Sequence, residues 1–155
     1  GIAGWLRALP LATARECAAL AGAGLPESID LVAEMEPVDP PGSRRLLAYE
    51  RAGFRKIDPQ GIAYLQPDFR PAAEIDRSGL APLRLVLVVR RCGAETEATL
   101  PAAEVRAIVS SLYLMYGLEL READMRPLWQ HLESLPAGDR PIRLLDPTGP
   151  PGSTS

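Results

Sequence analysis

Cysteine, histidine and aromatic residues are scarce in this chain of 155 residues, which holds 2 cysteines, 1 histidine and 5% aromatic residues. Cys17 and Cys92 stand far apart and form no CxxC pair, so the sequence supports neither a disulfide scaffold nor a cysteine-rich zinc site. Because His131 is the only histidine, a two-histidine metal site within one chain is excluded, and a Ser-His-Asp hydrolase would depend on that one residue. We therefore expect no metal cofactor.

Long apolar runs and an excess of basic charge are absent as well. No run approaches the roughly 20 apolar residues that a membrane-spanning helix needs. The first residues mix apolar side chains with Arg7 and Arg15, which is not the pattern of a secretory signal. A formal net charge of −3 disfavours a broad surface for nucleic acid. We expect a cytoplasmic protein that binds neither nucleic acid nor membranes.

Hydrophobic periodicity and turn residues predict an α/β fold. Helices are expected over residues 6–20, 44–52, 105–116 and 125–135, and strands over residues 30–36, 61–66 and 83–91. Gly53 is expected to end the second helix in the left-handed region. Asp124 is the expected cap of the last helix, which would place Pro127 in its first turn. In the strand over residues 30–36, alternation puts Glu34 and Glu36 on one face and Leu31, Ala33 and Met35 on the other.

The last two expected helices form a helical hairpin that packs against the sheet or a partner. Val105, Val109 and Leu112 belong to one apolar stripe, and Met125 and Trp129 belong to the other. These stripes are broader than a single contact ridge, which favours a homodimer through the hairpin or through a free sheet edge. The alternative is a monomer whose hairpin closes over its own sheet.

An ordered set of segments carries a family resemblance. The sequence Tyr49-Glu50-Arg51-Ala52-Gly53-Phe54 follows the strand over residues 30–36 and precedes two further strands. This order resembles the second half of the GNAT-type N-acetyltransferases. Gly1-Ile2-Ala3 resembles the end of the loop with which that family holds the pyrophosphate of CoA. The resemblance covers roughly residues 1–92 and implies the C-terminal half of an acetyltransferase-like mixed sheet, in a truncated or a degenerate member.

The resemblance implies an acetyl-CoA-dependent N-acetyltransferase, or part of one, acting on a small-molecule or peptide primary amine. It implies that Tyr49 donates a proton to the departing thiolate, since a phenol is neutral and can donate at neutral pH. It also implies that the amides of Gly1, Ile2, Ala3 and Gly4 hold the phosphates of acetyl-CoA. The organisation expected is an acetyltransferase-like region over residues 1–93, a helical hairpin extension over 94–146 and a flexible tail over 147–155.

Carboxylates and a polar strand complete the candidate site. Glu34 or Glu36 could take the proton from the substrate amine, or each could simply reach solvent or pair with Arg44 or Arg45. Tyr64 and Gln66 share one face of the strand over residues 61–66, where they line an acceptor pocket or are ordinary edge-strand residues. The competing function is a non-catalytic interaction or dimerisation module, in which the sheet serves only as a scaffold.

Overall fold

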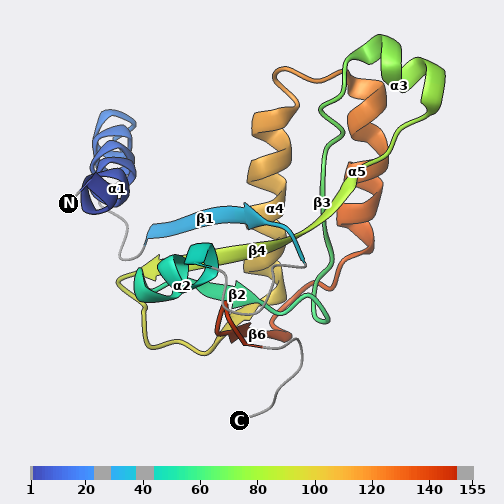
Figure 1. Ribbon diagram of the computed structural model, residues 1–155. Helices are drawn as coiled ribbons and strands as arrows, with labels where there is room; N and C mark the ends of the chain where they lie inside the picture. The colour runs from blue at the N-terminus through green and yellow to red at the C-terminus, as the bar shows by residue number, and fades with distance from the viewer. Residues whose placement is uncertain (1, 23–28, 38–43, 150–155) are drawn as a thin grey trace.

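The computed structural model describes residues 2–22, 29–37 and 44–149, with side chains from residue 10 onward. The helices are α1 (Ile2–Leu20), α2 (Arg44–Arg51), α3 (Ala72–Ser78), α4 (Ala102–Tyr116) and α5 (Glu122–Ser134). The strands are β1 (Ile29–Met35), β2 (Arg55–Ile57), β3 (Tyr64–Gln66), β4 (Leu83–Cys92), β5 (Thr99–Pro101) and β6 (Pro141–Leu145). Figure 1 shows the strands in the middle of the molecule, between α2 and the pair formed by α4 and α5.

Strand β4 is the centre of the sheet. Its run of Leu and Val residues is buried from Leu85 to Val89, as expected for a strand with neighbours on both edges. On one edge β1 pairs with it antiparallel, with Glu34 opposite Leu87. On the other edge β3 pairs with the start of β4 and β2 with its later part, both antiparallel. The sheet continues through β6 to β5, in the order β1-β4-β2-β6-β5.

The two faces of the sheet have separate apolar clusters. Helices α4 and α5 cover one face with Val105, Val109, Met125 and Leu128, which pack on β3 and β4. Helix α2 covers the other face, where Met35, Phe54 and Val88 are buried. The side chains of β1 alternate between the two faces of the sheet. Those of Leu31, Ala33 and Met35 belong to the cluster on the α2 face, whereas that of Val32 packs on the α4 face.

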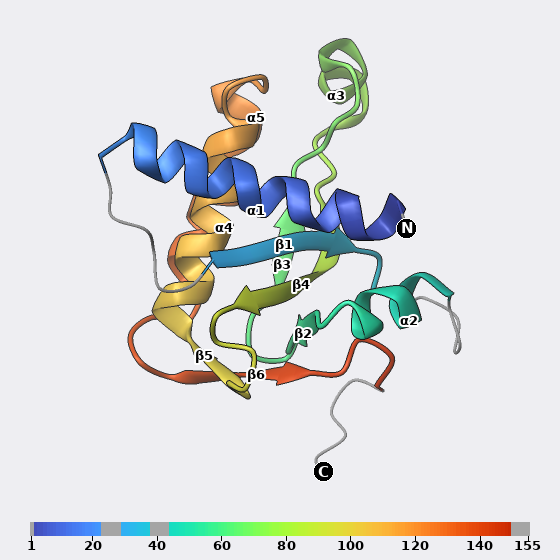
Figure 2. The same cartoon turned by 90° about the vertical axis from the view of Figure 1, so that its left-hand side faces the viewer.

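The connection from β3 to β4 extends beyond the sheet and carries α3, which stands apart from it in both views (Figure 2). The buried carboxylate of Asp68 holds the base of this connection. It accepts hydrogen bonds from the guanidinium of Arg70, at 2.6 Å, and from the backbone N–H of Ala81, at 2.9 Å. Arg121, just before α5, reaches Asp76 of α3 with a hydrogen bond of 2.9 Å. The connection is therefore attached to the rest of the fold at both ends of its excursion.

The mixed α/β fold and its main elements are confirmed. Gly53 ends the second helix with φ +80°, as its position in the sequence predicts. Residues 99–101 and 141–145 add two strands that the sequence patterns did not reveal.

Several boundaries were wrong. The strand expected over residues 61–66 begins only at Tyr64, because Asp58 holds the preceding residues in a turn through bonds from the N–H groups of Gly61 and Ile62. The backbone before that turn forms β2 instead. The last helix begins at Glu122 with Arg121 as its cap, so Asp124 lies inside the first turn and Pro127 lies within the helix.

The helical hairpin closes over its own sheet. Tyr113 and Leu128 are fully buried in the same cluster as Leu87 and Val89 of β4. The expected regions 1–93 and 94–146 thus share one core. Of the expected tail, Thr148 and Gly149 contact the body, the latter through a bond from Lys56 Nζ to its carbonyl, and residues 150–155 lie outside the described residues. The homodimer stays a prediction.

Candidate functional site

A carboxylate on the α4 side of the sheet gathers polar side chains from three elements. Glu34 of β1 accepts hydrogen bonds from the hydroxyls of Tyr64 on β3 and Tyr116 on α4, and from the amide of Gln66 on β3. The bond from Tyr116 measures 2.6 Å and that from Gln66 Nε2 measures 3.0 Å. We call Glu34, Tyr64, Gln66 and Tyr116 the Glu34 cluster.

The sheet register brings these residues together. Tyr64 lies opposite Leu85 and Gln66 lies opposite Leu83, so both side chains project from the same face of β3. Glu34 lies opposite Leu87 on the other edge of β4, and its side chain extends across that strand toward Tyr64. Tyr116 stands in the last turn of α4, above this point. The sequence analysis selected Glu34, Tyr64 and Gln66, and the structure places the three in direct contact.

Aromatic packing fixes the tyrosines of the site. The rings of Tyr64 and Tyr113 stack with centroids 6.1 Å apart, and Trp129 meets Tyr113 edge-on at 5.5 Å. The hydroxyl of Tyr113 donates to the carbonyl of Leu65 at 2.8 Å, which ties α4 to β3. Because the ring of Tyr64 is stacked on the anchored ring of Tyr113, its hydroxyl is directed at the carboxylate before any ligand arrives.

Burial keeps these tyrosines protonated. Burial raises the pKa of Tyr64 far above its ordinary value, and the hydrogen bond to Glu34 raises it further. The same two causes, in the same order, raise the pKa of Tyr116. Burial also raises the pKa of Tyr113, to about 12. The donors to Glu34 are therefore neutral throughout the physiological range, so they stabilise its negative charge without cancelling it.

The carboxylate of Glu34 can accept a further hydrogen bond, and the described residues do not pair its charge with a cation. A carboxylate offers about four lone-pair directions, and the cluster's donors occupy three of them. Within residues 29–37 and 44–149, none of the ion pairs formed by Lys or Arg involves Glu34. A half-buried carboxylate with neutral donors and no cation can hold an ammonium group or accept a proton from one.

The other expected catalytic residues lie elsewhere. Tyr49 of α2 is on the opposite face of the sheet, where its ring meets Phe54 edge-on at 5.0 Å. Glu36 follows the end of β1, and its side chain is 69% exposed with Arg45 3.8 Å away. The strand that carries Glu34 is also an edge of the described sheet rather than an inner strand. The structure thus does not bring Tyr49 or Glu36 to the Glu34 cluster.

The expected phosphate-binding residues begin α1. Ile2, Ala3 and Gly4 form the first turn of that helix, and Gly1 lies outside the described residues. Helix α1 contacts β1 and runs alongside it in the opposite direction (Figure 2). The first turn itself has no acidic residue.

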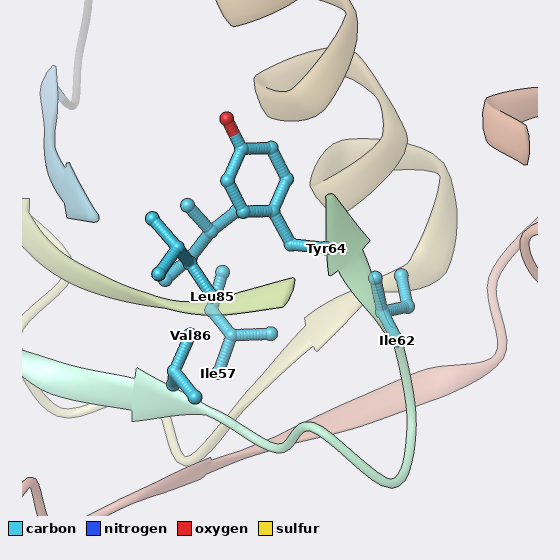
Figure 3. Close-up of a pocket in the computed structure, with 6 residues that line it drawn as sticks. Ile57, Ile62, Tyr64, Leu85 and Val86 are labelled. Carbon is cyan, nitrogen blue, oxygen red and sulfur yellow. The ribbon is translucent and has the colours of Figure 1, made fainter. Parts of the chain in front are cut away.

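A shallow recess lies below the ring of Tyr64. It is lined by Ile57, Ile62, Leu85, Val86 and Leu87, and the hydroxyl of Tyr64 points away from the two labelled isoleucines (Figure 3). The recess has no space even for a water molecule, and its lining is aliphatic. It is therefore part of the packed core beneath the Glu34 cluster, and the polar side of the site is the hydroxyl side of Tyr64.

Sequence reasoning missed Tyr116 as a site residue. Tyr116 follows Leu112 by four positions and so lies on the apolar stripe of its helix, although a tyrosine at the edge of a stripe usually has a partner for its hydroxyl. His131 has a structural contact, with Nε2 2.8 Å from the carbonyl of Ala63 before β3. In the described part of the chain, no group of His, Cys, Asp and Glu side chains is arranged to hold a metal ion.

No protein-family model, curated protein or solved structure matches this chain. Among the described helices, none has both the length and the apolar character that crossing a membrane requires.

Proposed function

We propose that the protein is an acetyl-CoA-dependent N-acetyltransferase, or part of one, that acts on a primary amine, with Glu34 as the carboxylate that receives the amine. The observation that carries the proposal is the Glu34 cluster. Tyr64 and Gln66, two residues expected from the sequence to line the acceptor pocket, each donate a hydrogen bond to Glu34, one of the carboxylates expected as the base. A cluster of this kind positions a carboxylate for proton transfer at an amine nitrogen.

The order of elements supports an acetyltransferase-like fold. Helix α1 precedes β1, α2 carries the Tyr49–Phe54 motif, and strands β2 and β4 follow and pair with each other. Gly53 has the positive φ that ends the motif's helix, and Phe54 is buried directly after it. This order agrees with the resemblance, except that β2 is an additional strand and the strand expected over residues 61–66 is shortened to β3.

Each residue of the site has a defined part in the proposed reaction. Glu34 binds the ammonium group and accepts its proton at a carboxylate oxygen, directly or through water, which frees the nitrogen lone pair for attack. Tyr64, Gln66 and Tyr116 hold that carboxylate in one orientation. The departing thiolate takes its proton from the protonated Glu34 or from water, because Tyr49 lies on the opposite face of the sheet from the cluster. Acetyl-CoA supplies the acetyl group as a thioester, and the first turn of α1 suits its phosphates.

A non-catalytic interaction module is the alternative function. Two observations favour it: Tyr49 and Glu34 lie on opposite faces of the sheet, and the described part of β1 has no strand on its outer edge. In such a module the Glu34 cluster would only tie α4 to the sheet.

Calorimetry and a thiol-release assay separate the two functions. The unmodified chain is titrated with acetyl-CoA, and release of free CoA is then followed with a panel of primary amines. We expect saturable binding, and we expect Glu34→Gln to lower turnover by about 10²–10⁴-fold. The matched control is Glu36→Gln, which removes a neighbouring exposed carboxylate and should leave turnover unchanged. Absence of acetyl-CoA binding would overturn the proposal in favour of the interaction module.

A further inference from the structure

The charge balance around Glu34 points to a single ammonium group. Its donors in the cluster are phenols and an amide, which are neutral. A partly buried carboxylate reaches a lower free energy when a cation completes its coordination. The nearest acidic residue along β3 and its connection is Asp68, and this carboxylate is already occupied by Arg70 and by the N–H of Ala81. Among the described residues, the carboxylates of the β3–β4 connection, Asp68, Glu74 and Asp76, are each paired with an arginine, whereas Glu34 is not.

The surroundings of the cluster are apolar and partly exposed. Phe69 packs edge-on against Tyr116 with ring centroids 5.2 Å apart, yet Phe69 is 53% exposed. Leu83 lies opposite Gln66 in the pairing of β3 with β4, and it is 52% exposed. Because cross-strand partners project from the same face, Leu83 shares the face that carries Gln66 and Tyr64. Two half-exposed apolar side chains thus border a carboxylate for which the described residues supply no ion-pair partner.

From this juxtaposition we infer that the acceptor is a monoamine with an apolar, preferably aromatic, body. Its ammonium group lies on Glu34 and its body contacts Phe69 and Leu83. Tyr116 links the two halves of the site, since its hydroxyl contacts Glu34 and its ring contacts Phe69. The inference rests on the proposed function for the reaction that follows binding, but the binding itself does not require acetyl-CoA.

Four small molecules test separately the ammonium group and the apolar body that the site is inferred to bind. The full chain is titrated calorimetrically, without acetyl-CoA, with 2-phenylethylamine, ethanolamine, 2-phenylethanol and spermidine. We expect 2-phenylethylamine to bind about tenfold or more tightly than ethanolamine, because a phenyl ring buries far more apolar area than a hydroxyl. We expect no binding of 2-phenylethanol, which lacks the ammonium group. Spermidine should bind no more tightly than ethanolamine, because the carboxylates of the β3–β4 connection are already paired with arginines.

Variants assign the binding to these residues. Phe69→Ala and Leu83→Ala should each weaken 2-phenylethylamine binding by about three- to tenfold, and should leave ethanolamine binding unchanged. Leu118→Ala is the matched control, because Leu118 is 86% exposed and contributes to none of the hydrogen bonds or ring contacts described for the cluster. Glu34→Gln should abolish binding of both amines. Tyr116→Phe serves as a second variant if Glu34→Gln fails to fold, and it should weaken binding while retaining the ring that contacts Phe69.

Several outcomes would overturn the inference. One is tighter binding of spermidine or ethanolamine than of 2-phenylethylamine, another is equal binding of 2-phenylethanol, and a third is an effect of Phe69→Ala no larger than that of Leu118→Ala. Binding of 2-phenylethylamine without any binding of acetyl-CoA would support this inference and refute the transferase. Acetyl transfer to other amines without binding of 2-phenylethylamine would do the reverse.

Discussion

Arg91 holds three segments of the fold together, and its removal should destabilise the protein more than the loss of any exposed arginine. The residue is 8% exposed, and its guanidinium forms ion pairs with Asp30 at 3.3 Å and with Glu97 and Glu104. These carboxylates come from β1, from the β4–β5 connection and from the first turn of α4. Replacement by methionine keeps a long apolar side chain and removes the charge.

The expected loss follows from the burial of the partners. Removing one member of a buried ion pair costs about 3–5 kcal/mol, because the remaining charge is left without compensation. Asp30 has only 18% of its side chain exposed, whereas Glu97 and Glu104 are 50% and 34% exposed and can turn toward water. We therefore expect Arg91→Met to lower the free energy of unfolding by about 3 kcal/mol. In a domain of this size, that corresponds to about 6–12 °C in melting temperature.

Urea denaturation of the purified variant measures this change. The matched control is Arg84→Met on the same strand, where the side chain is exposed. We expect the control to change the free energy of unfolding by no more than about 0.5 kcal/mol. If Arg91→Met is no more destabilising than Arg84→Met, the cluster is not a structural element of the fold.

The pH dependence of stability gives a second readout of the same cluster. Burial raises the pKa of Glu104, and the charge of Arg91 opposes that rise. A carboxyl with a raised pKa binds its proton more tightly in the folded state, so its contribution to stability falls as the pH rises from its ordinary pKa through the raised one. Without Arg91 the pKa of Glu104 rises further, and the decline becomes larger and reaches higher pH. Parallel stability curves for the variant and the unmodified chain would contradict this account.

Three further substitutions test other parts of the structure. Gly53→Ala should lower the free energy of unfolding by about 1–2 kcal/mol, because Gly53 has φ +80°, which an alanine adopts only with strain, although there is room for its Cβ. An unchanged thermal unfolding curve would mean that the chain relaxes to another turn. Tyr113→Phe should cost about 1 kcal/mol in urea unfolding, since it leaves the carbonyl of Leu65 without its buried donor, and an unchanged midpoint would argue against that bond. Tyr49→Phe should leave the rate and pH profile of the proposed acetyl transfer unchanged, because Tyr49 lies on the opposite face of the sheet from Glu34, and a loss of about 10²–10⁴-fold without a change in folding would establish Tyr49 as the proton donor that the resemblance implies.

The sequence alone determined those elements whose signals are local. The apolar, β-branched run of β4, the alternation of β1 and the helix that ends at Gly53 all follow from spacing within a few residues, and each lies where it was expected. That the side chains of Tyr64 and Gln66 share one face of their strand was predictable for the same reason, because alternation along a strand is a local property. Glu34 was a candidate because a carboxylate within an apolar strand needs a partner.

Only the tertiary structure decided which distant residues meet. Strand β2 has 3 residues, too few for a periodic signal, and it forms because the edge of β4 supplies its hydrogen bonds. Tyr116 joins Glu34 across 82 positions of the chain, through the packing of α4 on the sheet rather than through any motif. The separation of Tyr49 from Glu34 has the same origin. The pleat of β1 directs the side chain of Glu34 to the face covered by α4, whereas α2, which carries Tyr49, packs on the opposite face of the sheet.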